Sequence, residues 1–442
     1  MATPEALVKY YDCLKDSFNK IQDKDNEVAL INAALRPKIR EELAKSDVLL
    51  NSYLNYIQVF CLIYNEKFNN VCSSVICPLF KEHKVKVKDE ETAKTTTATK
   101  LHQTIQHIVT NSPGLTEEFA YCVVKVFPSL ERAETGEFYT YLENSLQMCT
   151  YLEGEPMSII LCKILERLNP PKSNGDSSDA EKPVEAHVLE SYDILYDFFK
   201  KLNPIVRAKV VKSLLVIVAR DLLREMSSNM CHLITYVCSL DPEYAESLIS
   251  LLWDTFTDVS KPLGERRASV EFASFFLARA KYITLEDLLN YLETTSNWCH
   301  EFLEDHSNID IPSGTNERID AFYAVAQSIF YLITQRYREM YEDETISSLN
   351  KMRLDKIICN RLRPLEHCDK TVEEKFREVD SLYKLFNISE FDATPIKKRR
   401  LSTDLSRSRS RFVLMADDDT PKEVRPLYRF FYEPKNFTIY RE

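Results

Sequence analysis

Glycine is scarce in this sequence, with 6 residues among 442, whereas glycine makes up about 7% of an average protein. The closest two, Gly136 and Gly154, are 18 positions apart. Phosphate-binding loops, dinucleotide fingerprints and nucleophile elbows need glycines roughly two to five residues apart, so none of them can be built here. Tight hairpin turns also favour glycine. The scarcity therefore excludes several enzyme classes and favours an all-helical chain.

Long apolar runs are also lacking. The longest run near the centre of the chain, Leu214 to Ala219, has six residues, whereas a membrane-spanning helix needs about 20, so we expect no membrane partner. The twelve cysteines are scattered through apolar stretches and no secretory leader precedes them. We therefore expect reduced core thiols in an intracellular protein.

What the sequence does contain is helical periodicity. Apolar residues recur at three- and four-residue spacing from Ile205 to Met226, as on one face of an α-helix. Asp241-Pro242 is typical of an N-cap followed by proline at the first helical position, and Thr284 with Asp287 resembles a capping box. Helix pairs of roughly 35–50 residues predict a helical-repeat solenoid.

The composition predicts a folded body and a charged tail. Residues 1–395 are expected to form the solenoid, with loops at about 84–99 and 169–186, and residues 396–442 a disordered tail, basic and serine-rich, then acidic, with an aromatic end. The net charge is −11; Lys397–Arg411 carries +6, so the remainder carries −17. An acidic body favours basic protein surfaces over nucleic-acid backbones, and no sequence-specific DNA binding is expected.

The stretch Glu265 to Ile283 has two interpretations, a kinase recognition motif and a core helix. Arg266-Arg267-Ala268-Ser269 is a sequence that basophilic kinases favour. The same residues also begin an amphipathic helix, with Glu271, Ser274, Ala278 and Lys281 on the polar face and Ser269 on the apolar face. A kinase needs an exposed, extended serine, so we favour the core helix.

Four blocks in order resemble the RNA polymerase I-specific transcription initiation factor family, also called TIF-IA. The blocks are "HLITYVCSLDPEYAESLISLLWDTF", "SFFLARAKYI", "AFYAVAQSIFYLITQRY" and "LNKMRLDKIICNRLRPLEHC". Upstream, "KVFPSLERAETGEFYTYLENSLQMC" and "SIILCKILERL" look like the family's middle helices. The resemblance therefore runs from about Lys125 to Pro395, and the first 120 residues show no clear match. The most recognisable helix contributes the family-like core residues Phe272, Phe275, Phe276, Leu277, Ala278, Arg279 and Ala280.

The resemblance implies a non-enzymatic, HEAT-like solenoid without cofactors. Such a protein would bind RNA polymerase I, link it to promoter-bound initiation factors at ribosomal RNA genes, and be switched by protein kinases. It would work in the nucleus and nucleolus. Two other classes stay open: a helical-repeat nuclear transport or assembly adaptor, and an RNA-binding factor acting through the arginine-serine tail.

Metal and catalytic motifs find little support. His300 and His306 are six residues apart, so they do not share a helical face as the zinc-protease histidines do. A zinc site from Cys299-His300 and His367-Cys368 would need adjacent ligands with poor tetrahedral geometry. We therefore expect no catalytic residue and no metal.

The expected regulatory sites lie in the polar segments. Lys397, Lys398, Arg399 and Arg400 form a basic run typical of a nuclear import signal. Ser177 and Ser178 precede acidic residues, which suits an acidophilic kinase. Ser402, Ser406, Ser408 and Ser410 follow or alternate with arginines. These six serines are the candidate phosphorylation sites.

Overall fold

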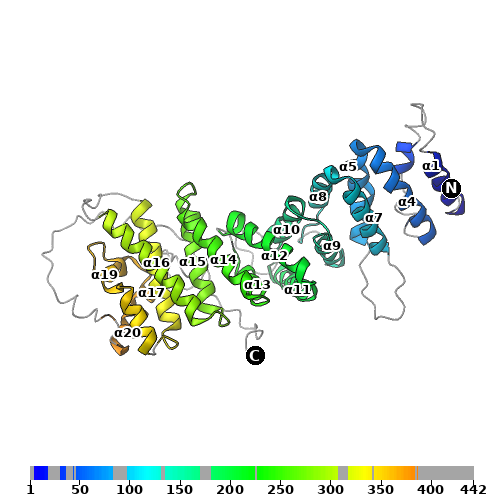
Figure 1. The fold of residues 1–442 in the computed structure, drawn as a ribbon. Helices are drawn as coiled ribbons and strands as arrows, with labels where there is room; N and C mark the ends of the chain where they lie inside the picture. Colours follow the sequence, from blue (N-terminus) through cyan, green and yellow to red (C-terminus); the bar gives the residue numbers. More distant parts are fainter. Residues whose placement is uncertain are drawn as a thin grey trace. The chain divides into compact units, whose positions relative to one another are not determined.

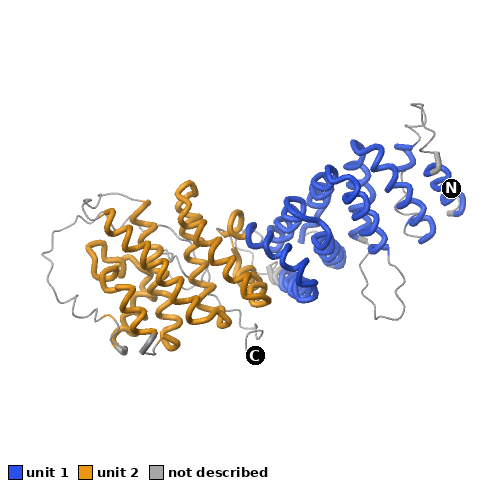
Figure 2. Tube along the Cα trace, viewed as in Figure 1, with its two compact units in different colours: residues 1–217 blue, residues 218–442 orange. Residues whose placement is uncertain are grey.

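The structure is a computed structural model. It describes residues 4–17, 30–35, 43, 46–82, 97–130, 135–169, 181–223, 226–306, 317–340, 343–383 and 386. Every regular element within these ranges is helical (Figure 1), so the all-α prediction is confirmed. The chain divides into two compact units, residues 1–217 and 218–442 (Figure 2).

Unit 1 is a succession of helices that pack on near neighbours in the sequence. Its main helices are α1 (Pro4–Ser17), α4 (Asp47–Ile63), α5 (Phe68–Val71), α6 (Cys77–Glu82), α7 (Thr97–Asn111), α8 (Thr116–Lys125), α9 (Thr135–Met148), α10 (Glu155–Leu168), α11 (Glu181–Lys201) and α12 (Pro204–Ile217). A π-helical turn, Cys72–Ile76, joins α5 to α6, and short 3-10 turns lie at Asn65–Lys67 and Pro113–Leu115. Helix α1 packs on α4, α4 on α7, α8 on α10 and α10 on α12. This neighbour-to-neighbour packing is the pattern of a helical repeat.

Unit 2 follows the same rule. Its elements are a π-helical turn (Val218–Leu222), α13 (Ser228–Ser239), α14 (Pro242–Thr257), α15 (Leu263–Arg279), α16 (Leu285–Asp305), α17 (Glu317–Arg336), α18 (Asp343–Lys351), α19 (Leu354–Ile358), η6 (a 3-10 turn, Pro364–His367) and α20 (Lys370–Tyr383). Helix α15 packs on α14 and α17, and α17 also contacts α16 and α20. Helices α15 and α17 therefore form the centre of this unit.

Local chemistry explains where several helices begin. The Asp241 carboxylate accepts a 3.1 Å hydrogen bond from the backbone N–H of Glu243, with Pro242 at the first helical position of α14. The predicted N-cap is therefore confirmed. At the start of α10, Gly154 has φ +66° and ψ −138°, a conformation open essentially to glycine alone.

Tyrosines hold together the N-terminal end of unit 1. The buried hydroxyls of Tyr11, Tyr53 and Tyr56 donate hydrogen bonds of 3.1, 2.7 and 2.6 Å to backbone carbonyls of residues 33, 34 and 30. A buried phenol needs such a partner. These bonds tie α1 and α4 to the short helical stretch at residues 30–34.

Two predicted loops are shorter than expected. Helix α7 begins at Thr97, inside the predicted 84–99 loop, and α11 begins at Glu181, inside the predicted 169–186 loop. In both places the lysine, threonine or proline content suggested a loop, whereas these residues form the first turn of a long helix. Residues 83–96, 170–180 and the predicted tail after 395 lie outside the described residues.

The membrane and disulfide expectations can be compared with the described parts of the chain. None of the described helices is long and apolar enough to cross a membrane. All twelve cysteines lie in described segments, none of them forms a disulfide, and eight are buried. The exposed ones, Cys13 and Cys359, depart from the expectation that the thiols lie in the core.

Candidate functional site

The helix with the family-like residues lies in the core of unit 2. Ten consecutive residues of α15, Ala268 to Leu277, are buried, including Ser269 with no exposed surface. The Ser269 hydroxyl donates a 2.7 Å hydrogen bond to the Arg266 carbonyl. The serine is thus held inside a helix, as the core-helix interpretation predicted.

The expected polar face of α15 is wrong. Glu271 and Ser274 were placed on a solvent-facing side, yet their exposures are 2% and 0%. The helix is covered on both sides because α14 and α17 both pack against it. Arg267 Nη2 lies 4.0 Å from Glu271 Oε1, and the Ser274 hydroxyl donates to the Val270 carbonyl at 2.9 Å. Glu271 and Ser274 therefore contact other protein groups, whereas the sequence periodicity predicted that they contact solvent.

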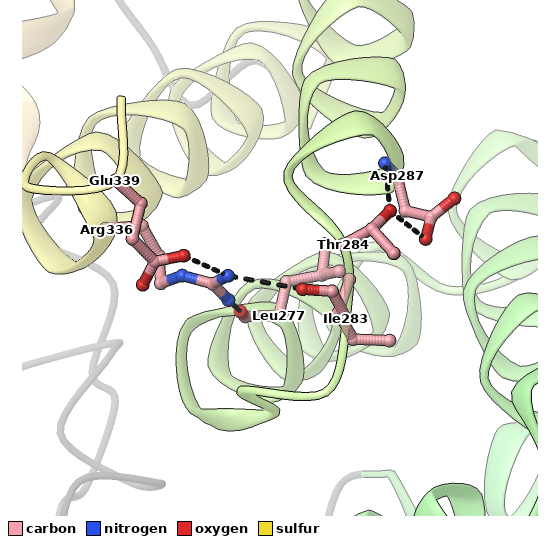
Figure 3. Close-up of polar contacts among 6 residues, drawn as sticks. All are labelled: Leu277, Ile283, Thr284, Asp287, Arg336 and Glu339. Carbon is pink, nitrogen blue, oxygen red and sulfur yellow. Dashed lines mark hydrogen bonds and ion pairs between the residues drawn. The ribbon is translucent and has the colours of Figure 1, made fainter. Parts of the chain in front are cut away.

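A buried arginine joins the end of α15 to the end of α17. Arg336, the last residue of α17 and 4% exposed, donates from Nη1 to the Leu277 carbonyl at 2.8 Å and from Nη2 to the Ile283 carbonyl at 3.3 Å (Figure 3). Its Nη2 also lies 2.5 Å from Glu339 Oε2. The last carbonyls of a helix have no partner within it and carry partial negative charge. The guanidinium therefore caps α15 and fixes the turn into α16.

The same turn starts α16 with its own cap. Thr284 Oγ1 accepts a 3.1 Å hydrogen bond from the Asp287 backbone N–H and donates to Asp287 Oδ2 at 2.5 Å (Figure 3). The predicted N-cap is confirmed. The aspartate, however, binds the threonine hydroxyl, because its side chain is one carbon shorter than the glutamate of a standard capping box.

On the other side of α17, aromatic and charged groups meet the segment before α20. The Tyr323 hydroxyl donates to the Leu362 carbonyl at 3.0 Å, and its ring stacks on His367 with centroids 4.2 Å apart. One helical turn earlier, burial raises the pKa of Asp320, an effect that Arg267 and His367 partly offset. These contacts anchor the turns between α18 and α20 on the core.

The residues considered for zinc have other roles. His300 Nε2 lies 2.8 Å from the Met352 carbonyl, and His306 stacks on Phe302 with centroids 4.1 Å apart. Cys299 is buried, and burial raises the pKa of its thiol. Across the residues that the structure describes, no group of three or more His, Cys, Asp or Glu could hold a metal. Polar side chains of this region, His300, Tyr323 and Arg336, are instead within hydrogen-bonding distance of backbone carbonyls.

The predicted site residues divide sharply by location. Of the family-like residues, Phe272, Phe275, Phe276, Leu277 and Ala280 are buried, whereas Ala278 and Arg279 are half-buried. The basic run Lys397–Arg400 and the six candidate serines lie outside the described residues. Sequence reasoning missed Arg336, and it missed that Arg353 and Arg363 have positive φ angles of 51° and 47°.

Comparisons with known proteins agree with the resemblance and extend it. A family model described as RNA polymerase I specific transcription initiation factor RRN3 matches residues 1–170 and 181–432. The match includes the first 120 residues, where the sequence reading found no clear resemblance. That interpretation of the sequence was too narrow because it relied on a few short blocks.

Individual relatives match only in part. The mouse RNA polymerase I-specific transcription initiation factor RRN3 is 27% identical over 166 residues, and tif-1A of Caenorhabditis elegans is 25% identical over 154 residues. The matched regions cover 35% and 33% of this chain but 24% and 23% of those relatives, so the chain spans about a quarter of their length. The crystal structure of RNA polymerase I transcription initiation factor Rrn3 is similar in fold, with a TM-score of 0.64 at 16% identity. The match covers 88% of this chain and 80% of the Rrn3 chain.

Proposed function

Because the chain belongs to the RNA polymerase I specific transcription initiation factor RRN3 family, we propose that it binds RNA polymerase I and supports initiation at ribosomal RNA genes. The observation that supports this most is the family match over residues 1–170 and 181–432. The relatives are themselves named as transcription initiation factors, and no catalytic activity is indicated.

The proposed mechanism is that of an adaptor. The helices of each unit pack on sequence neighbours, and helical arrays of this kind commonly use their solvent-facing sides as extended binding surfaces. One part of the chain would hold the polymerase and another would hold promoter-bound initiation factors. Binding would raise the local concentration of polymerase at the promoter.

We propose that the basic run directs the protein to the nucleus and nucleolus. Lys397, Lys398, Arg399 and Arg400 lie in a segment of charge +6 attached to a chain whose remainder carries −17. At physiological salt, charges interact over about 8 Å, so the segment would be attracted to the body only when it lies close.

We further propose that protein kinases act on this segment. Phosphates on Ser402, Ser406, Ser408 and Ser410 would add about −6 to −8 charges, which cancels the +6 of Lys397–Arg411. Import-receptor binding would weaken, while polymerase binding would change less because we assign it to the helical body. Ser177 and Ser178 are a second candidate site, with Asp179 and Glu181 beside them.

The test of the function is affinity purification of the full chain from its own cells, followed by identification of bound proteins. We expect the large RNA polymerase I subunits and promoter-bound factors. Transport factors or ribonucleoproteins in place of polymerase subunits would refute the proposal.

The test of the tail uses two variants, one with Ser402, Ser406, Ser408 and Ser410 changed to Asp, and one lacking residues 397–411. Both should lose nuclear accumulation. Polymerase co-purification should return when a foreign import signal is added to the deletion variant. A fully nuclear variant would contradict the import role, and a polymerase-binding defect that persists in the nucleus would place the tail in the binding site.

A further inference from the structure

Two turns, one at the end of α18 and one directly before η6, repeat the same four-residue pattern. Asn350-Lys351-Met352-Arg353 and Asn360-Arg361-Leu362-Arg363 each read asparagine, basic, large apolar, arginine. In each, the apolar residue is buried and the two basic residues are exposed. The pattern recurs after ten residues.

The backbone of the two turns is also alike. Arg353 N–H donates to the Asn350 carbonyl at 3.2 Å, and Arg363 N–H donates to the Asn360 carbonyl at 3.1 Å. Arg353 comes directly before α19 and Arg363 directly before η6, and these two short helices contact each other. The sequence repeat is therefore also a structural repeat on one part of unit 2.

Both arginines adopt a conformation that disfavours a side chain. Their φ angles of 51° and 47° are the only positive values at non-glycine residues in the described parts of the chain. Glycine adopts this region without cost and asparagine tolerates it, yet asparagine stands three residues earlier in each motif. Strained positions of this kind concentrate where a side chain serves binding.

The fold makes little use of most of these side chains. Arg361 differs, because its Nη2 donates a hydrogen bond to the His306 carbonyl. Among the described residues, the side chains of Lys351, Arg353 and Lys356 form no hydrogen bond or ion pair, and Arg363 pairs only with the exposed Glu366 at 2.7 Å. Exposed pairs of this kind contribute little to stability. The backbone conformation of Arg353 and Arg363 therefore costs folding free energy that their side-chain contacts do not offset.

We propose that Lys351, Arg353, Lys356, Arg361 and Arg363, here named the paired-arginine surface, bind an acidic segment of a partner protein. The guanidinium group presents a planar fork of donors that matches a carboxylate. Residues 351–367 hold five basic and two acidic residues, a net charge of +3, on a chain of charge −11. A basic surface on an acidic protein selects a short acidic ligand.

The surface fits an acidic peptide better than nucleic acid. Asp355 and Glu366 are exposed among the basic residues. A DNA duplex carries one charge per about 1.7 Å of its axis and would repel both carboxylates and the acidic body. A peptide can instead place neutral or basic residues opposite Asp355 and Glu366. The proposal goes beyond polymerase binding, and its test needs no polymerase.

The test measures binding of a fluorescein-labelled peptide rich in Asp and Glu to the full chain, by fluorescence anisotropy at about 0.15 M salt. Two double variants are compared with the wild type: Arg353→Ala with Arg363→Ala, and Arg353→Gly with Arg363→Gly. Each should weaken peptide binding by about tenfold or more, since charge-assisted hydrogen bonds are lost. The control, Lys125→Ala with Lys375→Ala, removes the same charge from exposed positions on α8 and α20 and should change binding less than about twofold.

Thermal unfolding separates binding from folding. The glycine double variant should melt about 2 °C or more above the wild type because the backbone strain is relieved, whereas the alanine double variant should not. Peptide affinity equal to wild type in both double variants, or an equal loss in the control, would overturn the proposal. A lower melting temperature of the glycine variant would also overturn it. The proposal would also be overturned if a labelled DNA duplex of equal net charge bound more tightly than the peptide and lost that binding in the same two double variants.

Discussion

The Arg336 side chain donates a 2.8 Å hydrogen bond to the carbonyl of Leu277, a residue 59 positions earlier in the chain. The bond joins the last residue of α17 to the last turn of α15, and a second bond from the same guanidinium reaches the Ile283 carbonyl. One side chain thus fixes the end of one helix, the turn after it and the end of another helix.

Replacing Arg336 with methionine should destabilise the protein. The apolar stem would stay, but the carbonyls of Leu277 and Ile283 would lose their buried donor, at a cost of roughly 2–4 kcal/mol. Urea unfolding measures the change. Arg338→Met, on an exposed arginine two residues later, should cost less than about 0.5 kcal/mol. Equal effects of the two variants would show that the bonds of Arg336 are not important for stability.

Phe276→Ala tests the core position of α15. Phe276 has no exposed surface, so its truncation should cost about 3–5 kcal/mol through lost burial and an unfilled cavity. Val259→Ala is the matched control, because Val259 is 83% exposed and its truncation should leave the unfolding midpoint almost unchanged. A Phe276→Ala midpoint within error of the wild type would mean that this ring is not in the core.

Ser269→Asp separates the core helix from the kinase motif. The carboxylate would be fully buried beside the Arg266 carbonyl, which the hydroxyl now binds at 2.7 Å, and an unpaired buried charge is strongly destabilising. Ser269→Ala should cost only about 1 kcal/mol, the value of one hydrogen bond. The melting temperatures of the two variants give the comparison. An unchanged melting temperature for Ser269→Asp would show that Ser269 is exposed and accessible to kinases.

The pH dependence of stability should include a contribution from His102. Its Nε2–H donates to Asn144 Oδ1 at 3.1 Å, its Nδ1 lies 3.1 Å from the Tyr151 hydroxyl, and Asn144 Nδ2 donates to the Phe80 carbonyl at 2.7 Å. Burial lowers the pKa of His102 from 6.5 to about 4. As pH falls, the unfolded chain therefore takes up this proton before the folded chain does. The contribution of the neutral imidazole to the free energy of unfolding is fully present above pH 6.5 and is lost progressively toward pH 4, by about 3 kcal/mol in total.

Denaturation midpoints across this pH range measure the His102 effect. His102→Gln should lower stability at about pH 7 but flatten the pH dependence, since glutamine does not titrate. His107→Gln, on the exposed side of the same helix, should keep the slope of the wild type. If His102→Gln also keeps that slope, the buried imidazole does not cause it.

Features set by neighbouring residues were predictable from the sequence. The caps at Asp241 and Thr284 depend on side chains that reach backbone N–H groups two or three residues away, so the local pattern is enough. The scarcity of glycine led to the correct fold class because hairpins and nucleotide-binding loops need it. The four family-like blocks led to the family, although the matched region was underestimated.

Features set by distant residues were not predictable. Glu271 and Ser274 have the spacing of a polar face, but α14 and α17 cover them, and periodicity does not reveal a second neighbouring helix. The partners of Arg336 are backbone carbonyls 53 and 59 residues away, so no side-chain motif marks them. The repeated Asn-basic-apolar-Arg pattern was visible in the sequence, whereas the positive φ angles of its arginines were not.

The neighbour-to-neighbour packing of the helices has a consequence for synthesis on the ribosome. Helix α1 needs α4, α4 needs α7 and α8 needs α10, so each helix finds its partner within a few tens of residues of chain. Domains with such local contacts fold quickly, and each pair can close while later helices are still being translated. Ribosome-bound chains that end soon after Leu168 should therefore already protect α4 and α7 from protease. Full cleavage of these helices in ribosome-bound chains that extend well beyond residue 217, the end of unit 1, would show that folding does not begin with local helix pairs.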